Sequence, residues 1–260
     1  MNNVHVHVPY PKIREYLTYI IQNRLNLEIF FPSSSLDSLK KEDIKTLKER
    51  LDYHPSLSIH APFMDMSPGA VDSKIRDVTV ERFLQVMEIA ELLAPKIVVF
   101  HSGYEKWKYG HRVDIWLEES LTTWRPLRER ATALNLKIAI ENIFEDEPSN
   151  LLMLMEELHS EHFGLCFDTG HFNLFTRLPL EEWLKSLKPY IFELHLHDND
   201  KSRDQHLPIG EGTFNFAALF AELKDNHCVY TIETHTPDRV LKSMERLQEY
   251  ITASPSGSLG

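Results

Sequence analysis

Seven ionisable side chains stand at the ends of six consecutive apolar, β-rich runs of the sequence. They are His60, His101, Glu141, Asp168, His195, His197 and Glu233. Imidazoles and carboxylates are good ligands for divalent metals. One such residue has little meaning, because a lone His at a strand end is more often a hydrogen-bonded rim residue. Six runs in a row that end this way predict one shared metal site, since burying so many ionisable groups together without a cation is costly.

Two further segments extend this set beyond the ends of the runs. In Asp168-Thr169-Gly170-His171, a His follows a carboxylate by three residues. Asp204 and His206 precede a stretch with Gly and Pro, which suits a loop that folds back over the site. A helix-capping carboxylate beside a surface His would also explain the first segment. For the second, a solvated polar loop is an equally good explanation.

The elements that must position these residues alternate regularly along the chain. Strands are predicted at residues 4–8, 27–31, 57–60, 97–101, 137–141, 164–168, 191–197 and 229–233. Helices are predicted at about 11–25, 40–51, 71–93, 113–134, 150–158, 180–187, 216–224 and 238–251. This alternation predicts a parallel sheet, and eight units favour a single (β/α)8 TIM barrel over an open sheet. The carboxyl ends of the strands would then bring the candidate ligands to one face.

Length and composition agree with one barrel domain. The chain has 260 residues, of which 42% are hydrophobic and 26% charged. We expect the barrel to span residues 1–253 and residues 254–260, rich in Ser and Gly, to be a disordered or vector-derived tail. No Gly-rich phosphate-binding fingerprint follows the first predicted strand, which disfavours a Rossmann fold.

The composition also limits the partners and the cellular environment that we expect. The formal net charge is −11, which disfavours nonspecific binding to nucleic acid. No apolar run reaches the roughly 20 residues of a membrane span, and the first residues do not resemble a secretory signal. Cys166 and Cys228 lie in apolar runs, so we expect buried free thiols and a cytoplasmic protein.

The segments that carry these residues resemble the xylose-isomerase-like barrel superfamily. The matching stretches, in chain order, are residues 58–63, 99–103, 140–142, 167–171, 195–198, 204–212 and 232–234. This superfamily contains sugar isomerases and epimerases, dehydratases of cyclic polyols and dehydroshikimate, and endonuclease IV. The resemblance extends over nearly the whole chain, and it implies the barrel fold more specifically than it implies one reaction.

The resemblance implies two alternative ligand patterns. In the one-metal isomerases and epimerases, a Mn, Co or Mg ion would be held by two Glu, one Asp and one His. The matching residues are Glu141, Asp168, Glu233 and either His195 or His197. The two His point to the same face of a strand, so the choice between them stays open. The endonuclease IV pattern implies two to three Zn ions held by His60, His101, Glu141, Asp168, His171, His195, Asp204, His206 and Glu233.

The favoured function is a metal-dependent isomerase or epimerase, or a related dehydratase, of a sugar or sugar phosphate. By resemblance, Glu141 and Glu233 would take and return a proton beside a carbonyl, through an enediolate. His171 and Arg203 would contact substrate oxygens. Phe63 and Trp107 could pack against sugar carbons, although ordinary rim packing explains them as well. Oligomers are common among such barrels, but the sequence carries no distinctive interface signal.

The alternative function is an AP endonuclease, a zinc phosphodiesterase that acts on abasic DNA. All nine residues of the endonuclease pattern have a counterpart, which favours it. The strand-end loops carry no basic stretch that would bind a duplex backbone, which disfavours it. A binding barrel without catalysis is disfavoured by the presence of both Glu141 and Glu233.

Overall fold

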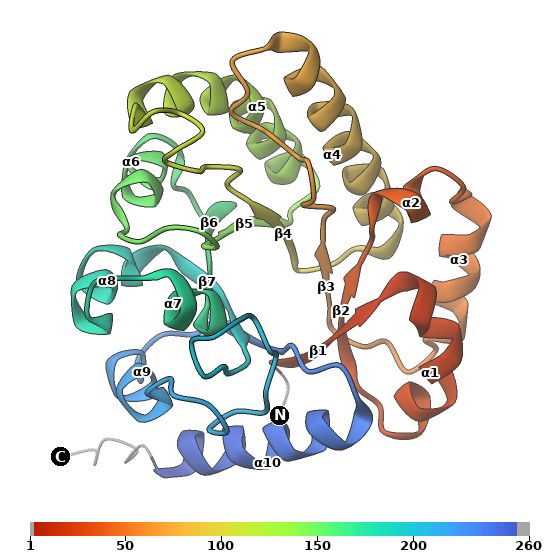
Figure 1. Cartoon of the computed structure of the whole chain (residues 1–260). Coiled ribbons are helices and arrows are strands. Elements are labelled where there is room, and N and C mark those ends of the chain that lie inside the picture. Colours follow the sequence, from red (N-terminus) through yellow and green to blue (C-terminus); the bar gives the residue numbers. More distant parts are fainter. Residues whose placement is uncertain (1–2, 254–260) are drawn as a thin grey trace, which may run out of the picture.

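Eight parallel strands close into a barrel in the computed structural model, which describes residues 3–253. Each strand pairs with the next in sequence, and the last pairs with the first. Figure 1 looks into the barrel, with the strands in the middle and the helices outside them. The predicted single TIM barrel is confirmed, while the predicted tail lies outside the described residues.

The strands follow the predicted runs closely. They are β1 (Val4–Pro9), β2 (Asn26–Phe30), β3 (Leu57–His60), β4 (Ile97–His101), β5 (Lys137–Glu141), β6 (Phe163–Asp168), β7 (Ile191–Leu196) and β8 (Val229–Ile232). The last two strands end one residue earlier than predicted. His197 and Glu233 therefore lie just beyond the ladder rather than in it.

The main helices also match the periodic segments. The helices are α1 (Tyr10–Gln22), α2 (Ser33–Leu36), α3 (Lys41–Arg50), α4 (Ser73–Leu93), α5 (Val113–Ala133), α6 (Ser149–Leu158), α7 (Thr169–Phe175), α8 (Leu180–Leu187), α9 (Phe216–Glu222) and α10 (Pro237–Ala253), with a 3-10 turn η1 (Lys188–Tyr190). The sequence analysis missed α2, α7 and η1. Each is too short to show an amphipathic period.

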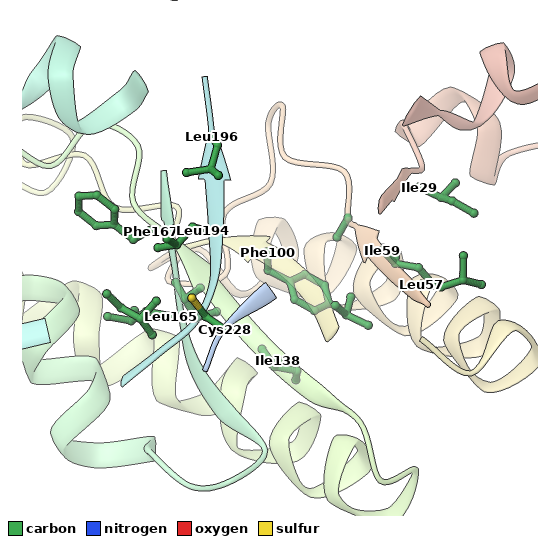
Figure 2. Packing of buried hydrophobic residues seen from close by; sticks show 14 of the residues in the cluster. Ile29, Leu57, Ile59, Phe100, Ile138, Leu165, Phe167, Leu194, Leu196 and Cys228 are labelled. Atoms are coloured by element: carbon green, nitrogen blue, oxygen red, sulfur yellow. The ribbon is translucent and has the colours of Figure 1, made fainter. Parts of the chain in front are cut away.

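The outer face of the barrel packs against the helices and forms the main core. Phe100 of β4 is fully buried, and its ring centroid lies 4.6 Å from that of Phe83 in α4 and 5.5 Å from that of Trp124 in α5. Figure 2 shows part of this layer, including Phe100, Ile138 and Leu165. The strands are thus fixed from outside, independently of the polar groups within.

The inside of the barrel holds a second, smaller apolar cluster. It consists of Ile97, Val99, Ala139, Cys166 and Val229. Strand side chains alternate between the two faces, so His101, two residues beyond Val99, also points inward. Cys166 and Cys228 are buried free thiols, as predicted. Among the described residues, no helix is both long and apolar enough to cross a membrane.

Candidate metal centre

The ten predicted metal ligands lie together at the carboxyl end of the barrel, and we call this set of ten residues the ring. They surround a cavity of about 400 Å³, which is lined in part by seven of them: His60, His101, Glu141, His171, Asp204, His206 and Glu233. Asp168, His195 and His197 lie beneath it with no exposed surface. The barrel therefore brings together residues that are up to 173 positions apart, from 60 to 233.

His60, His101 and Glu141 form the first group, at the ends of β3, β4 and β5. Nε2 of His60 lies 3.0 Å from Glu141 Oε2, and Nε2 of His101 lies 3.1 Å from the same oxygen. The register pairs His101 directly with Glu141 across neighbouring strands. Two imidazoles and a carboxylate that converge in this way form a ligand set typical of zinc.

A second group meets deeper in the barrel, around Nδ1 of His195. This nitrogen lies 3.4 Å from Glu233 Oε1 and 3.5 Å from Glu141 Oε1. It also lies 3.8 Å from Asp168 Oδ2. Asp168 and His195 are paired in the register of β6 and β7, so the ladder fixes their separation. Glu141 belongs to both this group and the first one.

A third group lies toward the mouth and is centred on Asp204. Asp204 Oδ2 lies 2.9 Å from Nε2 of His206 and 3.6 Å from Nε2 of His171. Asp204 Oδ1 lies 3.6 Å from Nδ1 of His197. The rings of His197 and His206 are stacked, with centroids 4.0 Å apart. His195 and His197 therefore both face the site and share Asp168 Oδ2, but His195 also lies near Glu141 whereas His197 lies near Asp204.

The unpredicted helix α7 explains how His171 reaches this group. Asp168 ends β6 and is the N-cap of α7, because its Oδ1 accepts a hydrogen bond of 2.6 Å from the His171 backbone nitrogen. Asp168 Oδ2 remains 3.0 Å from Nε2 of His197. The sequence analysis treated a helix cap as an alternative to a metal ligand at this position. Asp168 caps the helix with Oδ1, and its Oδ2 faces the other candidate ligands.

The loop that carries Asp204 and His206 folds back over the site, as predicted. Asp198 and Leu207 exchange both backbone hydrogen bonds, of 2.9 and 2.8 Å. The Asp198 carboxylate accepts bonds from the backbone nitrogens of Gly212, at 2.8 Å, and Phe214, at 3.1 Å. His206 has a positive φ of 47°, a left-handed conformation that is uncommon for residues other than glycine. The loop is therefore fixed by the scaffold rather than by the ligands it carries.

Three of the candidate ligand histidines have one ring nitrogen bonded to a backbone carbonyl. Nδ1 of His60 and Nδ1 of His206 each lie 2.8 Å from a carbonyl oxygen, and Nδ1 of His171 lies 3.1 Å from one. A carbonyl only accepts, so Nδ1 carries the proton. Nε2 then faces Glu141 in His60, and Asp204 in His171 and His206. Each of these pairs needs a proton or a cation between its two acceptors.

The unpaired nitrogens of strand seven test whether the residues suit a metal. Nδ1 of His195 and Nδ1 of His197 are buried and have no hydrogen-bond partner among the described residues. An unpaired buried nitrogen is costly unless something else binds it. With the mixed imidazole and carboxylate donors around them, these two nitrogens fit a divalent cation such as Zn, Mn or Co.

The charges of the candidate ligands strongly affect one another's pKa values. Burial raises the pKa of Glu141, but the imidazoles of His101 and His195 outweigh this effect and hold that pKa well below its usual range. Burial lowers the pKa of His171, yet Asp168, Asp204 and Glu141 raise it well above its usual value. Glu141 is thus ionised, and a proton on His171 helps to balance its charge when no cation is bound.

Four phenylalanines form part of the cavity wall. Phe30, Phe63, Phe144 and Phe175 line it, and the described lining residues include no Lys or Arg. The ring of Phe63 stacks on His101 with centroids 4.6 Å apart. Phe63 is therefore at the position predicted for a substrate contact.

Two other predicted contact residues lie away from this cavity. Trp107 is 78% exposed, and its ring packs edge-on against His111 with centroids 4.4 Å apart. Arg203 is exposed. Neither is among the described residues that line the cavity. Arg203 was predicted from the family resemblance and Trp107 from its place near the mouth, and a loop can direct such residues outward.

Two residues of the site, His7 and Glu28, were missed. Nδ1 of His7 lies 2.9 Å from Glu28 Oε1 and 2.9 Å from Glu233 Oε1. Burial lowers the pKa of His7, but Glu233 and Glu28 raise it to about 10. Both could have been predicted from the alternation of side chains along β1 and β2. His7 lies two residues before the end of its strand and Glu28 lies between Leu27 and Ile29, so both face the barrel interior.

Comparisons with known proteins show the family to which this barrel belongs. The profile of the family described as "Xylose isomerase-like TIM barrel" matches residues 27–250. An uncharacterized protein of Methanocaldococcus jannaschii, MJ1311, is 33% identical over 224 residues, which cover 82% of this chain and 76% of that protein.

Two solved structures resemble nearly the whole chain. A "D-tagatose 3-epimerase-like protein" is 28% identical with a TM-score of 0.78, and the match covers 96% of this chain and 98% of that one. The TTHB071 protein of Thermus thermophilus, soaked with ZnCl2, is 25% identical with a TM-score of 0.82, over 98% of this chain and 100% of that one. The chain belongs to the xylose isomerase-like TIM barrel family.

Proposed function

We propose that this protein is a divalent-metal-dependent epimerase or isomerase of an unphosphorylated sugar. The observation that carries this proposal is the cavity itself, in which Glu141 and Glu233 both line a space with aromatic walls. Its volume of about 400 Å³ lies in the range of small-molecule sites. The similarity to the D-tagatose 3-epimerase-like protein supports the same substrate class.

The absence of lysine and arginine from the described cavity wall favours an unphosphorylated substrate. Enzymes that bind phosphate esters commonly use these side chains or a helix N-terminus for the anion. Here Phe30, Phe63, Phe144 and Phe175 offer apolar faces to the carbon skeleton instead. His171 and His206 remain available as polar partners for hydroxyl groups.

Glu141, Asp168, His195 and Glu233 would hold the catalytic metal, because these four residues meet around one imidazole nitrogen. When bound, a divalent cation supplies Lewis acidity that stabilises the negative charge developing on a substrate oxygen. The protein supplies the remaining requirements, which are orientation of the sugar, exclusion of water by the phenylalanines, and a base beside the reacting carbon.

The proton transfer is assigned to the two glutamates. Burial raises the pKa of Glu233, but His195 and His7 outweigh it and keep that carboxyl ionised. Glu233 can therefore accept the proton from the carbon beside the carbonyl, which leaves an enediolate. Glu141, or Glu233 itself, then returns a proton to give the epimer or isomer. The carboxylate that acts first and the face of the sugar it approaches decide which product forms.

One observation favours a second function, that of a zinc phosphodiesterase. His60, His101 and Glu141 form one possible ligand set, while Asp168, His171 and His197 form another. A site with several zinc ions could bridge a phosphate and activate a hydroxide. The phenylalanines of the wall and its lack of lysine and arginine among the described residues favour the sugar substrate over DNA.

Metal analysis beside activity assays separates these functions. The protein is loaded with Mn²⁺, Co²⁺, Mg²⁺ or Zn²⁺, the bound metal is counted by mass spectrometry, and each form is assayed with free ketoses, their phosphates and an oligonucleotide containing an abasic site. Interconversion of free ketoses is the expected result. Cleavage of the oligonucleotide by a multi-zinc form, with no turnover of any sugar, would refute the proposal.

A further inference from the structure

Glu28 is a fully buried carboxylate that the proposed reaction does not use. It lies in the middle of β2, points into the barrel below the ring, and has no exposed surface. Its Oε2 lies 3.2 Å from Nε2 of His195, and its Oε1 lies 2.9 Å from Nδ1 of His7. The hydroxyl of Ser58 lies 3.5 Å from Oε2. Each oxygen of Glu28 is thus taken by an imidazole nitrogen.

This contact fixes which nitrogen of His195 faces the ring. An ionised carboxylate only accepts hydrogen bonds, so Nε2 of His195 carries a proton and donates a hydrogen bond to Glu28. Nδ1 is then the nitrogen that lies 3.4 Å from Glu233 Oε1 and has no hydrogen-bond partner among the described residues. In metal sites, a partner of this kind sets the tautomer and orientation of the ligand imidazole and raises its basicity.

His197 has different surroundings. Its Nε2 lies 3.0 Å from Asp168 Oδ2, its Nδ1 lies 3.6 Å from Asp204 Oδ1, and its ring stacks on His206. Within residues 3–253, no buried side chain outside the ring holds either nitrogen of His197, whereas Glu28 approaches His195 from the side opposite the three carboxylates.

We propose that Glu28 is the positioning residue of the metal centre. By holding the proton on Nε2 of His195, it makes Nδ1 the ligand atom and makes His195 the strand-seven ligand of the inner metal. This inference rests on the metal centre of the proposed function. Glu28 itself is not a ligand in this assignment, because both of its oxygens are already occupied by His195 and His7.

Glu193 provides a matched control for a test of this role. It is also a fully buried glutamate of the barrel interior, on β7, two residues before His195. Its Oε1 accepts hydrogen bonds from Thr231 and, at 3.2 Å, from Ser58. It therefore shares the burial and the Ser58 contact of Glu28, but it makes no hydrogen bond to His195 in the described structure.

Competition with a fluorescent chelator measures the affinity for Zn²⁺ and for Mn²⁺. The proteins compared are the wild type, Glu28→Gln and Glu193→Gln. We expect Glu28→Gln to lose about 10- to 100-fold in affinity, the usual effect of removing such a partner. Glu193→Gln should keep the wild-type affinity, and both variants should bind as many ions as the wild type. Unchanged affinity in Glu28→Gln, an equal loss in Glu193→Gln, or one ion fewer in Glu28→Gln would each overturn the inference.

A measurement on the wild-type protein covers the case in which Glu28→Gln does not fold. Nitrogen-15 NMR of the zinc-loaded protein assigns the protonated and the metal-bound nitrogen of His195. We expect a proton on Nε2 and zinc on Nδ1, and the reverse pattern would overturn the inference. If the wild type binds neither Zn²⁺ nor Mn²⁺, the proposed metal centre fails as well. If it binds them with His195 in the reverse pattern, only the role of Glu28 fails.

Discussion

Each histidine of the ring must either keep a proton or exchange it for a cation. His171 shows the balance clearly: its Nδ1 is bonded to a backbone carbonyl, and its Nε2 faces Asp204. Without a metal, a proton on Nε2 satisfies Asp204. A metal held by Glu141 and Asp168 would neutralise the carboxylates that hold the proton on His171, so its pKa would fall and the proton would leave. The two states therefore differ in bound protons as well as in bound metal.

Metal binding should release protons at neutral pH. The pKa of His171 lies well above its usual value, since nearby carboxylates outweigh the effect of burial, so the metal-free protein carries a proton there at pH 7. The apparent affinity should consequently rise with pH until that imidazole is neutral without metal. Calorimetric titration with ZnCl2 in buffers of different ionisation enthalpy measures the protons released. Identical heats in all buffers would contradict this assignment.

Glu233→Gln should abolish turnover while the fold remains. Gln has nearly the same shape, and the His206 contact at this position is to the backbone oxygen of residue 233, which the substitution leaves in place. The amide cannot take up the proton, so we expect kcat to fall by about 10²- to 10⁴-fold, the usual contribution of general base catalysis. Circular dichroism checks the fold. Glu211→Gln, a change in a surface ion pair with Lys242, is the control and should leave kcat unchanged. Near-normal kcat in Glu233→Gln would remove it from the mechanism.

At the scale of elements, the strands were predictable and the loops between strand and helix were not. Apolar runs with alternating faces locate all eight strands to within one or two residues. The residues at the ends of these runs include most of the candidate metal ligands. Glu28 was missed because it lies inside a strand rather than at its end: alternation places it on the inward face of β2, but does not by itself mark it as part of the site. Trp107 was misplaced relative to the cavity because the direction of a loop depends on packing that the sequence does not display. Helix α7 was too short to leave a periodic signal, although it positions His171.

The packing of α7 against β7 depends on Gly170. A Cβ at this position would lie 2.0 Å from Cε1 and 2.4 Å from Nδ1 of His197. Gly170→Ala must therefore displace the imidazole or the helix. We expect a loss of about 1–3 kcal/mol in the free energy of unfolding, typical of overpacking, together with weaker binding of Zn²⁺.

Gly110→Ala is the comparison for this prediction. No heavy atom lies within 4 Å of a Cβ at Gly110, but φ is +57°, so the substitution strains the backbone without touching the ring. It should destabilise the protein by about 1–2 kcal/mol and leave metal affinity as in the wild type. Wild-type Zn²⁺ affinity in Gly170→Ala would show that displacing the His197 imidazole does not disturb Asp168, the proposed ligand that it contacts.

For the whole molecule, the ring draws on β3 to β8 and is bordered by His7 of β1, so nearly every strand contributes a charged or titratable group to one point. The apolar core outside the barrel holds the strands, while the polar cluster inside opposes closure unless its charges are balanced. The elements of the fold therefore follow from local patterns in the sequence. The density of charge at its centre follows only from closure of the barrel.

Removing metal should destabilise the protein as one unit. A ligand that binds only the folded state adds about 2.7 kcal/mol at a free concentration of 100 times Kd. Unfolding in urea, followed by tryptophan fluorescence and by circular dichroism, should shift to lower urea after treatment with EDTA. It should return with added ZnCl2 or MnCl2, and both signals should move together. A midpoint that does not depend on metal concentration would mean that no ion binds the folded barrel specifically.

The order of the candidate ligands along the chain also has a consequence for when the proposed metal centre could be filled during synthesis. His60 and His101 leave the ribosome long before Glu233, which follows the last strand, and β1 cannot pair with β8 until that strand is made. A nascent chain can offer only part of the ligand set, on an open sheet. Any ion it captures is held by an incomplete site and exchanges readily. Under the proposed function, the metal that fills the site would therefore be selected once β8 has been made, by the ions available to the closed barrel.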